Sequence, residues 1–317
     1  MEATPLEIVA SVVFAVAVLH TFLTKYFERL AHVYPRHAGL LHLLGEVEVV
    51  FGFWALVLML LMAWMDGKQS AIHYLEGRNF TEPLFVFVIM VVAASRPIML
   101  LVQSAILHMS RWLPFSPRLT LTFLILFLIP LLGSFITEPA AMTIAALLLG
   151  RQFYALRPSP RLAYATLGLL FVNISVGGTL THFAAPPVIM VAQAWNWGLA
   201  HMFTEFGWRA ALGIAGSTLA YYAAFRRELA TLAAAALPPA ARGRAPVPAW
   251  ITAVQVAFLA FTVWQAHHPA LFIGGFLFYL AFAQATAHHQ SPLDLRPPVL
   301  VGFFLAGLVV QIGRAHV

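Results

Sequence analysis

The sequence contains no cysteine and few charged residues. Without cysteine the chain cannot form a disulfide, a thiolate metal site or a cysteine nucleophile. Charged residues make up 9% of the chain, whereas soluble domains carry about 25%. Hydrophobic residues make up 61%, and a soluble fold could not cover so much apolar surface with polar groups. The composition therefore predicts a membrane protein whose main partner is the lipid bilayer.

Long apolar runs distinguish between the two classes of membrane protein. Strands of a transmembrane barrel alternate apolar and polar residues, whereas continuous runs of about 20 apolar residues are typical of spanning helices. We therefore expect an all-α polytopic membrane protein. The predicted spans cover residues 6–24, 41–64, 84–108, 208–225, 250–266 and 270–287, with a last span from 298.

The two ends of the sequence each carry a distinct signal. The first seven residues contain Glu2 and Glu7 but no Lys or Arg, whereas the start of a secretory signal is positively charged. We therefore expect the first apolar run to remain as a helix. Residues 312–317 resemble one reading frame of a common sequencing adapter, so we expect this tail to be non-native and the natural protein to continue.

Basic residues lie in the short loops between spans, where positive charge sets membrane orientation. The net charge of +6 is therefore no sign of a nucleic-acid partner. The rule predicts a bacterial-type inner-membrane protein with its N-terminus outside. Arg118 and Arg151 fall on the same side, so the segment of about 119–150 is expected to form a re-entrant hairpin with its tip at Thr137-Glu138-Pro139.

Counting crossings predicts the domain organisation. Residues 1–225 form a first transmembrane repeat with three spans, the hairpin, a broken helix at about 162–195 and one further span. A cytoplasmic linker follows at 226–248. The odd number of crossings places 249–311 in the opposite orientation, as the start of an inverted second repeat requires. A homodimer is possible.

The hairpin tip carries a carboxylate at membrane depth. Pro139 lacks a backbone donor and disfavours helix at Glu138, so one half-helix should end before it and another begin. The new N-terminus presents unpaired N–H groups and a positive dipole end. An ionisable group inside a membrane indicates a functional site, although Glu138 could also be a capping carboxylate that never titrates.

The second break lies in the segment 173–187. Gly177 and Gly178 permit an unwound or left-handed backbone, and prolines at 186 and 187 can start the next half-helix. Free carbonyls and side-chain oxygens are hard ligands suited to a small cation. The candidate ion-binding residues of the two breaks are Thr137, Glu138, Asn173, Ser175, Gly177, Gly178, Thr179, Thr181 and His182. His182 could handle a proton or serve only as a spacer.

These two motifs resemble the first repeat of the ion transporter superfamily, which includes arsenite permeases, sodium–proton antiporters and divalent-anion/sodium symporters. Its Gly-Gly-x-x-Thr-x-x-Gly-x-Pro-Pro-Asn pattern aligns without gaps with residues 177–188, and an Ala-Ala-Met stretch follows the tip at 140–142. Ala184 and Val188 depart from this pattern. The closest resemblance is to the sodium–proton antiporter branch.

The resemblance implies a sodium site bordered by Asn173, Gly178 and Thr181, with Thr137 and Glu138 facing them. The tip lacks the Ser-Asn-Thr triad of the anion symporters, and its negative charge should attract a cation. We therefore expect a secondary active transporter that exchanges sodium for protons, with these ions as cargo and no resident cofactor or metal. The alternative is a sodium-coupled dicarboxylate transporter or an arsenite or sulfate permease.

Other classes and residues are less strongly indicated. No Walker motif, phosphate-binding loop or Ser/His/Asp arrangement appears, so we expect no enzyme. A membrane scaffold without transport is a further alternative. Whether Glu46, Glu48 or Arg96 takes part is left open, and Arg96 could pair with Glu46 or only relax a kink.

Overall fold

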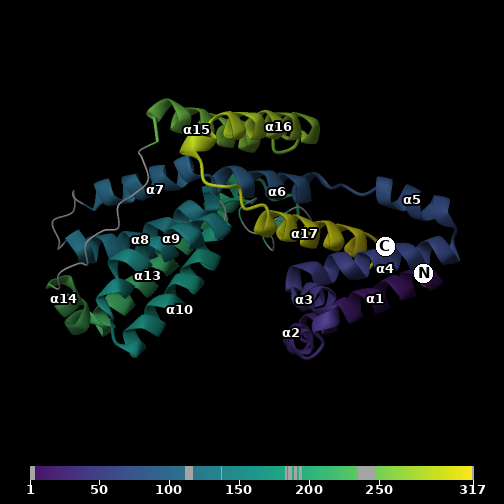
Figure 1. The fold of residues 1–317 in the computed structure, drawn as a ribbon, viewed down its shortest axis with the longest axis horizontal. Coiled ribbons are helices and arrows are strands. Elements are labelled where there is room, and N and C mark those ends of the chain that lie inside the picture. The colour runs from purple at the N-terminus through teal and green to yellow at the C-terminus, as the bar shows by residue number, and fades with distance from the viewer. Residues whose placement is uncertain are drawn as a thin grey trace. The chain divides into compact units, whose positions relative to one another are not determined.

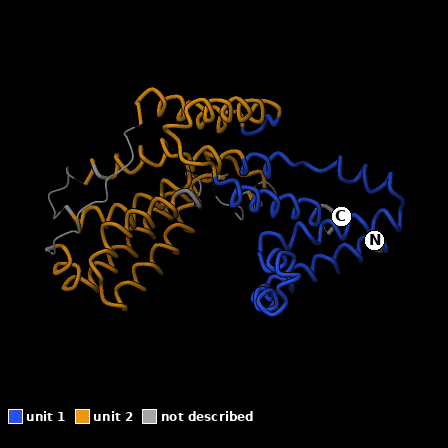
Figure 2. The backbone as a smooth tube through the Cα atoms, in the orientation of Figure 1, with its two compact units in different colours: residues 1–87, 266–269, 294–317 blue, residues 88–265, 270–293 orange. Residues whose placement is uncertain are grey.

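The computed structural model describes residues 4–110, 117–136, 138–182, 184, 188, 191–192, 195–234 and 247–315. Within these residues, all regular structure is helical (Figure 1). The chain divides into two compact units (Figure 2). Unit 1 comprises residues 1–87, 266–269 and 294–317, and unit 2 comprises 88–265 and 270–293. The all-α prediction is confirmed for the described part of the chain.

Three described helices are long and apolar enough to cross a membrane: Val47–Met65, Arg118–Ile136 and Pro160–Leu180. Two bent pairs raise the number to five if each pair is one span. The pair Pro5–Thr21 and Thr24–Val33 bends by 64°, and the pair Thr81–Ala93 and Arg96–Ile106 bends by 65°. The described helices therefore fit a polytopic membrane protein.

Unit 1 consists of the N-terminal helices and the last helix of the chain. Its first helix begins with a capping box, in which Thr4 and Glu7 satisfy each other's backbone N–H groups. Glu7 thus caps the predicted first span. The elements are α1 (Pro5–Thr21), α2 (Thr24–Val33), η1 (Pro35–His37), α3 (Ala38–Gly45), α4 (Val47–Met65), α5 (Lys68–Glu76) and α17 (Arg296–Ala315).

The last helix, α17, packs closely on α4 and also contacts α1. A methyl group on Gly307 would lie 2.5 Å from the backbone N of Gly52, so the two helices cross at glycine. Buried Gln311 donates to the carbonyl of Phe51 at 2.8 Å, and the Tyr74 hydroxyl donates to the carbonyl of Val310 at 2.6 Å. These contacts anchor the end of the predicted 249–311 segment on the N-terminal helices.

The helix α6 (Thr81–Ala93) begins in unit 1 and ends in unit 2. The predicted third span is therefore two helices, because Ser95 is extended and the next helix begins with Arg96 and Pro97. The other elements of unit 2 are α7 (Arg96–Met109), α8 (Pro117–Ile136), α9 (Glu138–Gln152), η2 (Tyr154–Leu156), α10 (Pro160–Gly177), η3 (Gly178–Leu180), α12 (Leu199–His201), η4 (Met202–Gly207), α13 (Trp208–Ala224), α14 (Arg226–Ala234), α15 (Ala249–Trp264), α16 (Pro269–Ala285) and η5 (Ala287–His289).

The core of unit 2 is a bundle of α8, α9, α10 and α13. Apolar side chains of α8 and α9 supply most of it, including Ile125, Ile129 and Leu148, which are almost fully buried. The first part of the predicted linker is helical and belongs to this bundle. In α14, the carboxylate of Glu228 accepts from the N–H and hydroxyl of Ser159 at 2.9 and 3.0 Å. Residues 235–246 of the linker lie outside the described residues.

Candidate ion site

The predicted hairpin is present as two helices that pack on each other, with a break at residue 137. The helix α8 ends at Ile136, and α9 begins with Glu138 in its first turn. Thr137 itself lies outside the described residues. The apolar stretch of α8 has 19 residues, which at about 1.5 Å per residue approaches the thickness of a bilayer core. The re-entrant course of the pair therefore stays a prediction.

The predicted break in the second helix is also present. The helix α10 ends at Gly177, one 3-10 turn follows, and Thr181 is extended with φ −124° and ψ 158°. The expected unwound or left-handed backbone at the two glycines is wrong, because both have right-handed helical angles. The backbone leaves the helix only after Leu180.

The two glycines are explained by close packing instead. A methyl group on Gly177 would overlap the carbonyl oxygen of Pro130 and lie 3.1 Å from the backbone N of Leu131. A methyl group on Gly178 would overlap Oε1 of Glu138 and lie 3.0 Å from its Cγ and Cδ. The Glu138 carboxylate therefore occupies the space that a side chain at position 178 would fill. We call this space the Gly178 notch.

Ser134 joins the two breaks and was not singled out from the sequence. Its buried hydroxyl donates to the carbonyl of Gly177 at 2.5 Å and accepts from the N–H of Leu180 at 3.0 Å. Its own carbonyl accepts from the buried hydroxyl of Thr181 at 2.6 Å. The Ser134 hydroxyl thus satisfies backbone groups at the end of α10 that lack helical partners. The Gly133-Ser134 pair next to the tip was its only signal in the sequence.

Asn173 lies in a different network from Glu138. Proline 130 lacks the N–H that would normally bond the carbonyl of Leu126 within α8. The side-chain amide of Asn173 donates to this carbonyl at 2.8 Å and to the hydroxyl of Thr218 at 3.1 Å. Its amide oxygen accepts from Ser217 at 2.9 Å. The amide of Asn173 therefore replaces the donor that proline removed and joins α8, α10 and α13.

The remaining predicted residues are placed as follows. The hydroxyl of Thr179 donates to the carbonyl of Val176 at 2.7 Å, so it closes the last turn of α10. Ser175 is exposed on α10, whereas His182 is half-buried directly after Thr181. The structure thus brings together Glu138, Gly178 and, through Ser134, Thr181. It does not bring Ser175 or Asn173 to the carboxylate.

The electrostatics of the Gly178 notch follow from the helix ends that meet there. The N-terminus of α9 carries a partial positive charge, and the C-terminal end of α10 carries a partial negative charge. Glu138 is half-buried, and among the described residues no Lys, Arg or His forms an ion pair with it. No cluster of three or more His, Asp or Glu residues occurs in the described ranges. The notch therefore offers a single carboxylate beside backbone carbonyls.

The structure places the three residues left open by the sequence, and two of them have partners. Glu46 forms an ion pair with Arg296 in unit 1. In unit 2, Arg96 donates to the carbonyl of His289 at 2.9 Å. Glu48 is exposed in the first turn of α4. None of these contacts involves Glu138.

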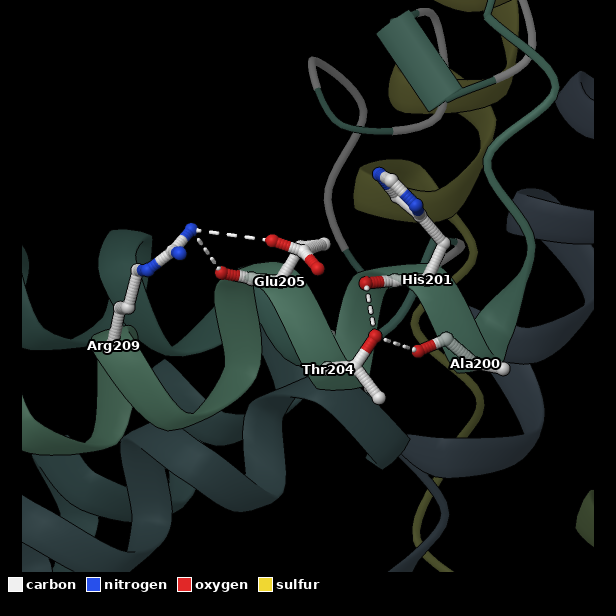
Figure 3. A network of polar contacts seen from close by, with 5 residues as sticks. All are labelled: Ala200, His201, Thr204, Glu205 and Arg209. Atoms are coloured by element: carbon white, nitrogen blue, oxygen red, sulfur yellow. Dashed lines mark hydrogen bonds and ion pairs between the residues drawn. The ribbon is translucent and has the colours of Figure 1, made fainter.

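A polar network runs from α12 through η4 to the start of α13 (Figure 3), and η4 packs against η3. Arg209 donates to the carbonyl of Glu205 at 2.7 Å and lies 3.6 Å from its carboxylate, and both side chains are exposed. The hydroxyl of Thr204 donates to the carbonyls of Ala200 and His201 at 2.9 and 3.3 Å. These are contacts within one helical segment, as expected of a surface network.

One family model matches residues 5–315, that is, nearly the whole chain, and its description is "Putative Na+/H+ antiporter". The chain belongs to this family. Membership supports a membrane protein that carries out cation/proton antiport, and a transporter rather than an enzyme. The matched segment includes four of the six residues expected to be a foreign tail. Neither the curated proteins nor the solved structures give a match.

Proposed function

We propose that this antiporter family member exchanges Na⁺ for H⁺ at the Gly178 notch, with Glu138 as the group that both ions use. The observation that carries the proposal is the position of the Glu138 carboxylate. It fills the space beside Gly178, at a helix break and without a cationic partner among the described residues. A carboxylate in such surroundings is costly when charged and unpaired, and either a proton or a metal cation removes that cost.

Sodium requires several oxygen ligands, and the Gly178 notch has oxygen atoms that can serve as such ligands. The carboxylate provides one or two, and carbonyls at the end of α10 provide others of the hard type that small cations prefer. Thr137, Thr179, Thr181 and His182 stay candidates for the remaining ligands or for proton transfer. We assign Asn173 a supporting role, because its amide is already hydrogen-bonded in the bundle.

Exchange then follows from competition. When Glu138 is protonated it loses its attraction for sodium, and when sodium binds the proton must leave. If the notch is exposed to one side of the membrane at a time, the two ions move in opposite directions. We further propose that the chain is an inner-membrane secondary transporter of the ion transporter superfamily, with an inverted repeat and its N-terminus outside, and that its partners are small cations.

The decisive experiment measures collapse of a preformed proton gradient in everted vesicles with a pH-sensitive dye. Addition of Na⁺ should dissipate the gradient in the wild type, and Glu138→Gln should abolish this response while the protein remains inserted in the membrane. Glu205→Gln is the matched control, because Glu205 is an exposed carboxylate on η4. Full activity of Glu138→Gln would overturn the role of this residue.

The same vesicles separate the proposal from the anion alternative. If Na⁺, Li⁺ and K⁺ all fail to dissipate the gradient, labelled dicarboxylate uptake driven by sodium should be measured next. Sodium-dependent uptake would then replace exchange as the function. The carboxylate at the tip argues against this result, because it would repel a dicarboxylate.

A further inference from the structure

Basic side chains gather at one end of the α8, α9, α10 and α13 bundle in unit 2. Two sets of hydrogen bonds bring its segments together. Arg118 at the start of α8 donates to the carbonyl of Leu232 in α14 at 2.7 Å, and Ser159, the N-cap of α10, donates to Glu228 of α14. Figure 1 shows α14 beside the ends of α8 and α13. We call this region the basic end, and its arginines are Arg118, Arg151, Arg157, Arg161, Arg226 and Arg227.

The positive charge of the basic end is largely uncompensated. Arg118 is half-buried, whereas the other five arginines are exposed, and none of these five forms an ion pair in the described part of the chain. Residues 117–234 contain three acidic residues, Glu138, Glu205 and Glu228. Of these, Glu228 alone lies at the basic end, and both of its carboxylate oxygens accept from Ser159. The exposed guanidinium groups are therefore available to an anionic partner.

The other end of the same bundle has balanced charge. The helix α13 begins beside the ion pair of Arg209 and Glu205 and ends at Ala224, directly before Arg226 and Arg227. Its 17 residues extend over about 26 Å, which is close to the thickness of about 30 Å of a bilayer core. The basic end is thus separated from the balanced end by nearly the depth of a membrane.

An exposed apolar stripe begins at the basic end and follows α10. Tyr164, Leu167 and Phe171 are 76%, 39% and 54% exposed. Residues three or four apart lie on the same face of a helix, and Arg161 precedes Tyr164 by three residues. One face of α10 therefore carries a guanidinium, then an aromatic ring of the kind found at membrane interfaces, and then apolar side chains. We call these three apolar residues the α10 stripe.

We propose that the basic end binds the headgroup of an anionic phospholipid, whose acyl chains lie along the α10 stripe. Guanidinium groups suit phosphate oxygens because their N–H donors can bind two oxygens at once. Clusters of about four to eight basic residues beside membrane helices are typical of sites for anionic headgroups. A soluble anion would use the arginines but not the stripe, so the two features together favour a lipid. The site lies at the opposite end of α8 and α10 from the Gly178 notch, and the inference does not depend on ion exchange.

The test uses the purified full chain in a neutral detergent. Phosphatidylglycerol and phosphatidylcholine with identical acyl chains are titrated separately, and bound lipid is counted by native mass spectrometry. We expect the apparent affinity for phosphatidylglycerol to be higher by about tenfold or more, because phosphatidylglycerol alone carries a net negative charge. Equal affinities would overturn the proposal. Glycerol phosphate, a soluble analogue of the headgroup, should not displace the bound lipid, and displacement would assign the arginines to a soluble anion instead.

The variants remove single charges from exposed positions. Arg226→Gln and Arg227→Gln should each lower the affinity for phosphatidylglycerol about fivefold, and the double variant should lower it about 25-fold if the effects add. Arg209→Gln is the matched control, because it removes an exposed arginine from the other end of α13. Its affinity should stay within about twofold of the wild type. An unchanged affinity in the double variant, or an equal loss in Arg209→Gln and Arg227→Gln, would contradict a site at the basic end.

Discussion

Two helix breaks in unit 2 differ in how their polar groups are satisfied. At the end of α10, Ser134 and Thr181 pair the freed backbone groups, and Glu138 fills the space beside Gly178. At the start of α7, Ser95 leaves its hydroxyl unpaired. The surroundings of the first break carry a carboxylate and those of the second carry a guanidinium. The difference teaches that the polar groups of a helix break can be satisfied by side chains of neighbouring helices or left without a hydrogen bond.

The largest expected effect concerns the close packing of the first break. Gly177→Ala places a methyl group against the backbone of α8 at Pro130, which cannot move as a side chain could. We expect a loss of about 3 kcal/mol in the free energy of unfolding, as for other overpacked sites. The control is Gly168→Ala on the same helix, where a methyl group meets nothing within 4 Å. Equal unfolding temperatures for the two variants would show that the helices are not this close.

The two serines test the comparison directly. Ser134→Ala removes two hydrogen bonds and leaves the N–H of Leu180 and the carbonyl of Gly177 unpaired, so it should cost about 2 kcal/mol. Ser95→Ala removes a buried hydroxyl that forms no hydrogen bond of good geometry, so it should change the stability by less than about 0.5 kcal/mol. Both values come from chemical denaturation. Equal costs would mean that the two breaks are satisfied alike.

Gly178→Ala should act on the ion and leave the fold largely intact. The added methyl group displaces the end of a flexible side chain, the Glu138 carboxylate, and spares the backbone. We expect the apparent affinity for sodium in the exchange assay to fall about tenfold, which corresponds to about 1.4 kcal/mol. If Gly178→Ala is produced at normal levels and its exchange depends on sodium as in the wild type, Glu138 is not part of the ion site.

The smallest effect is expected away from both breaks. Arg209 and Glu205 are exposed and one helical turn apart, and such pairs contribute about 0.3–0.5 kcal/mol. Arg209→Gln should therefore leave both the unfolding temperature and the exchange rate close to wild type. A large loss of exchange would instead show that η4 is part of the transport site. Residues of η4 could then no longer serve as controls.

The positions of the helix breaks could be predicted from the sequence, because proline and glycine limit the backbone locally. The breaks near Glu138 and after Gly177 are both present, and the kink considered at Arg96 is present as the break between α6 and α7. The reason for each glycine could not be predicted, because it depends on which helix packs against that face. Asn173 shows the same limit, since its role depends on a carbonyl 47 residues away that proline leaves unpaired.

The side-chain partners that residues find across helices could not be predicted from the sequence either. Ser134 looked ordinary in the sequence because its two main partners lie 43 and 46 residues later. The packing of α17 on α4 joins segments about 260 residues apart, as the bond from Gln311 to Phe51 shows. Hydropathy determines that a helix is buried in a membrane, but it does not determine which neighbour the helix meets.

The hydrogen bonds between α8 and α10 also have a mechanical consequence. Asn173 holds α10 to α8 at Leu126, and Ser134 and Thr181 hold the two together about two turns further along α8. Sliding one helix past the other would break all three bonds at once and press Gly177 into Pro130. The helices α8 and α10 must therefore travel as one rigid piece, and the hinges of any movement lie outside this pair.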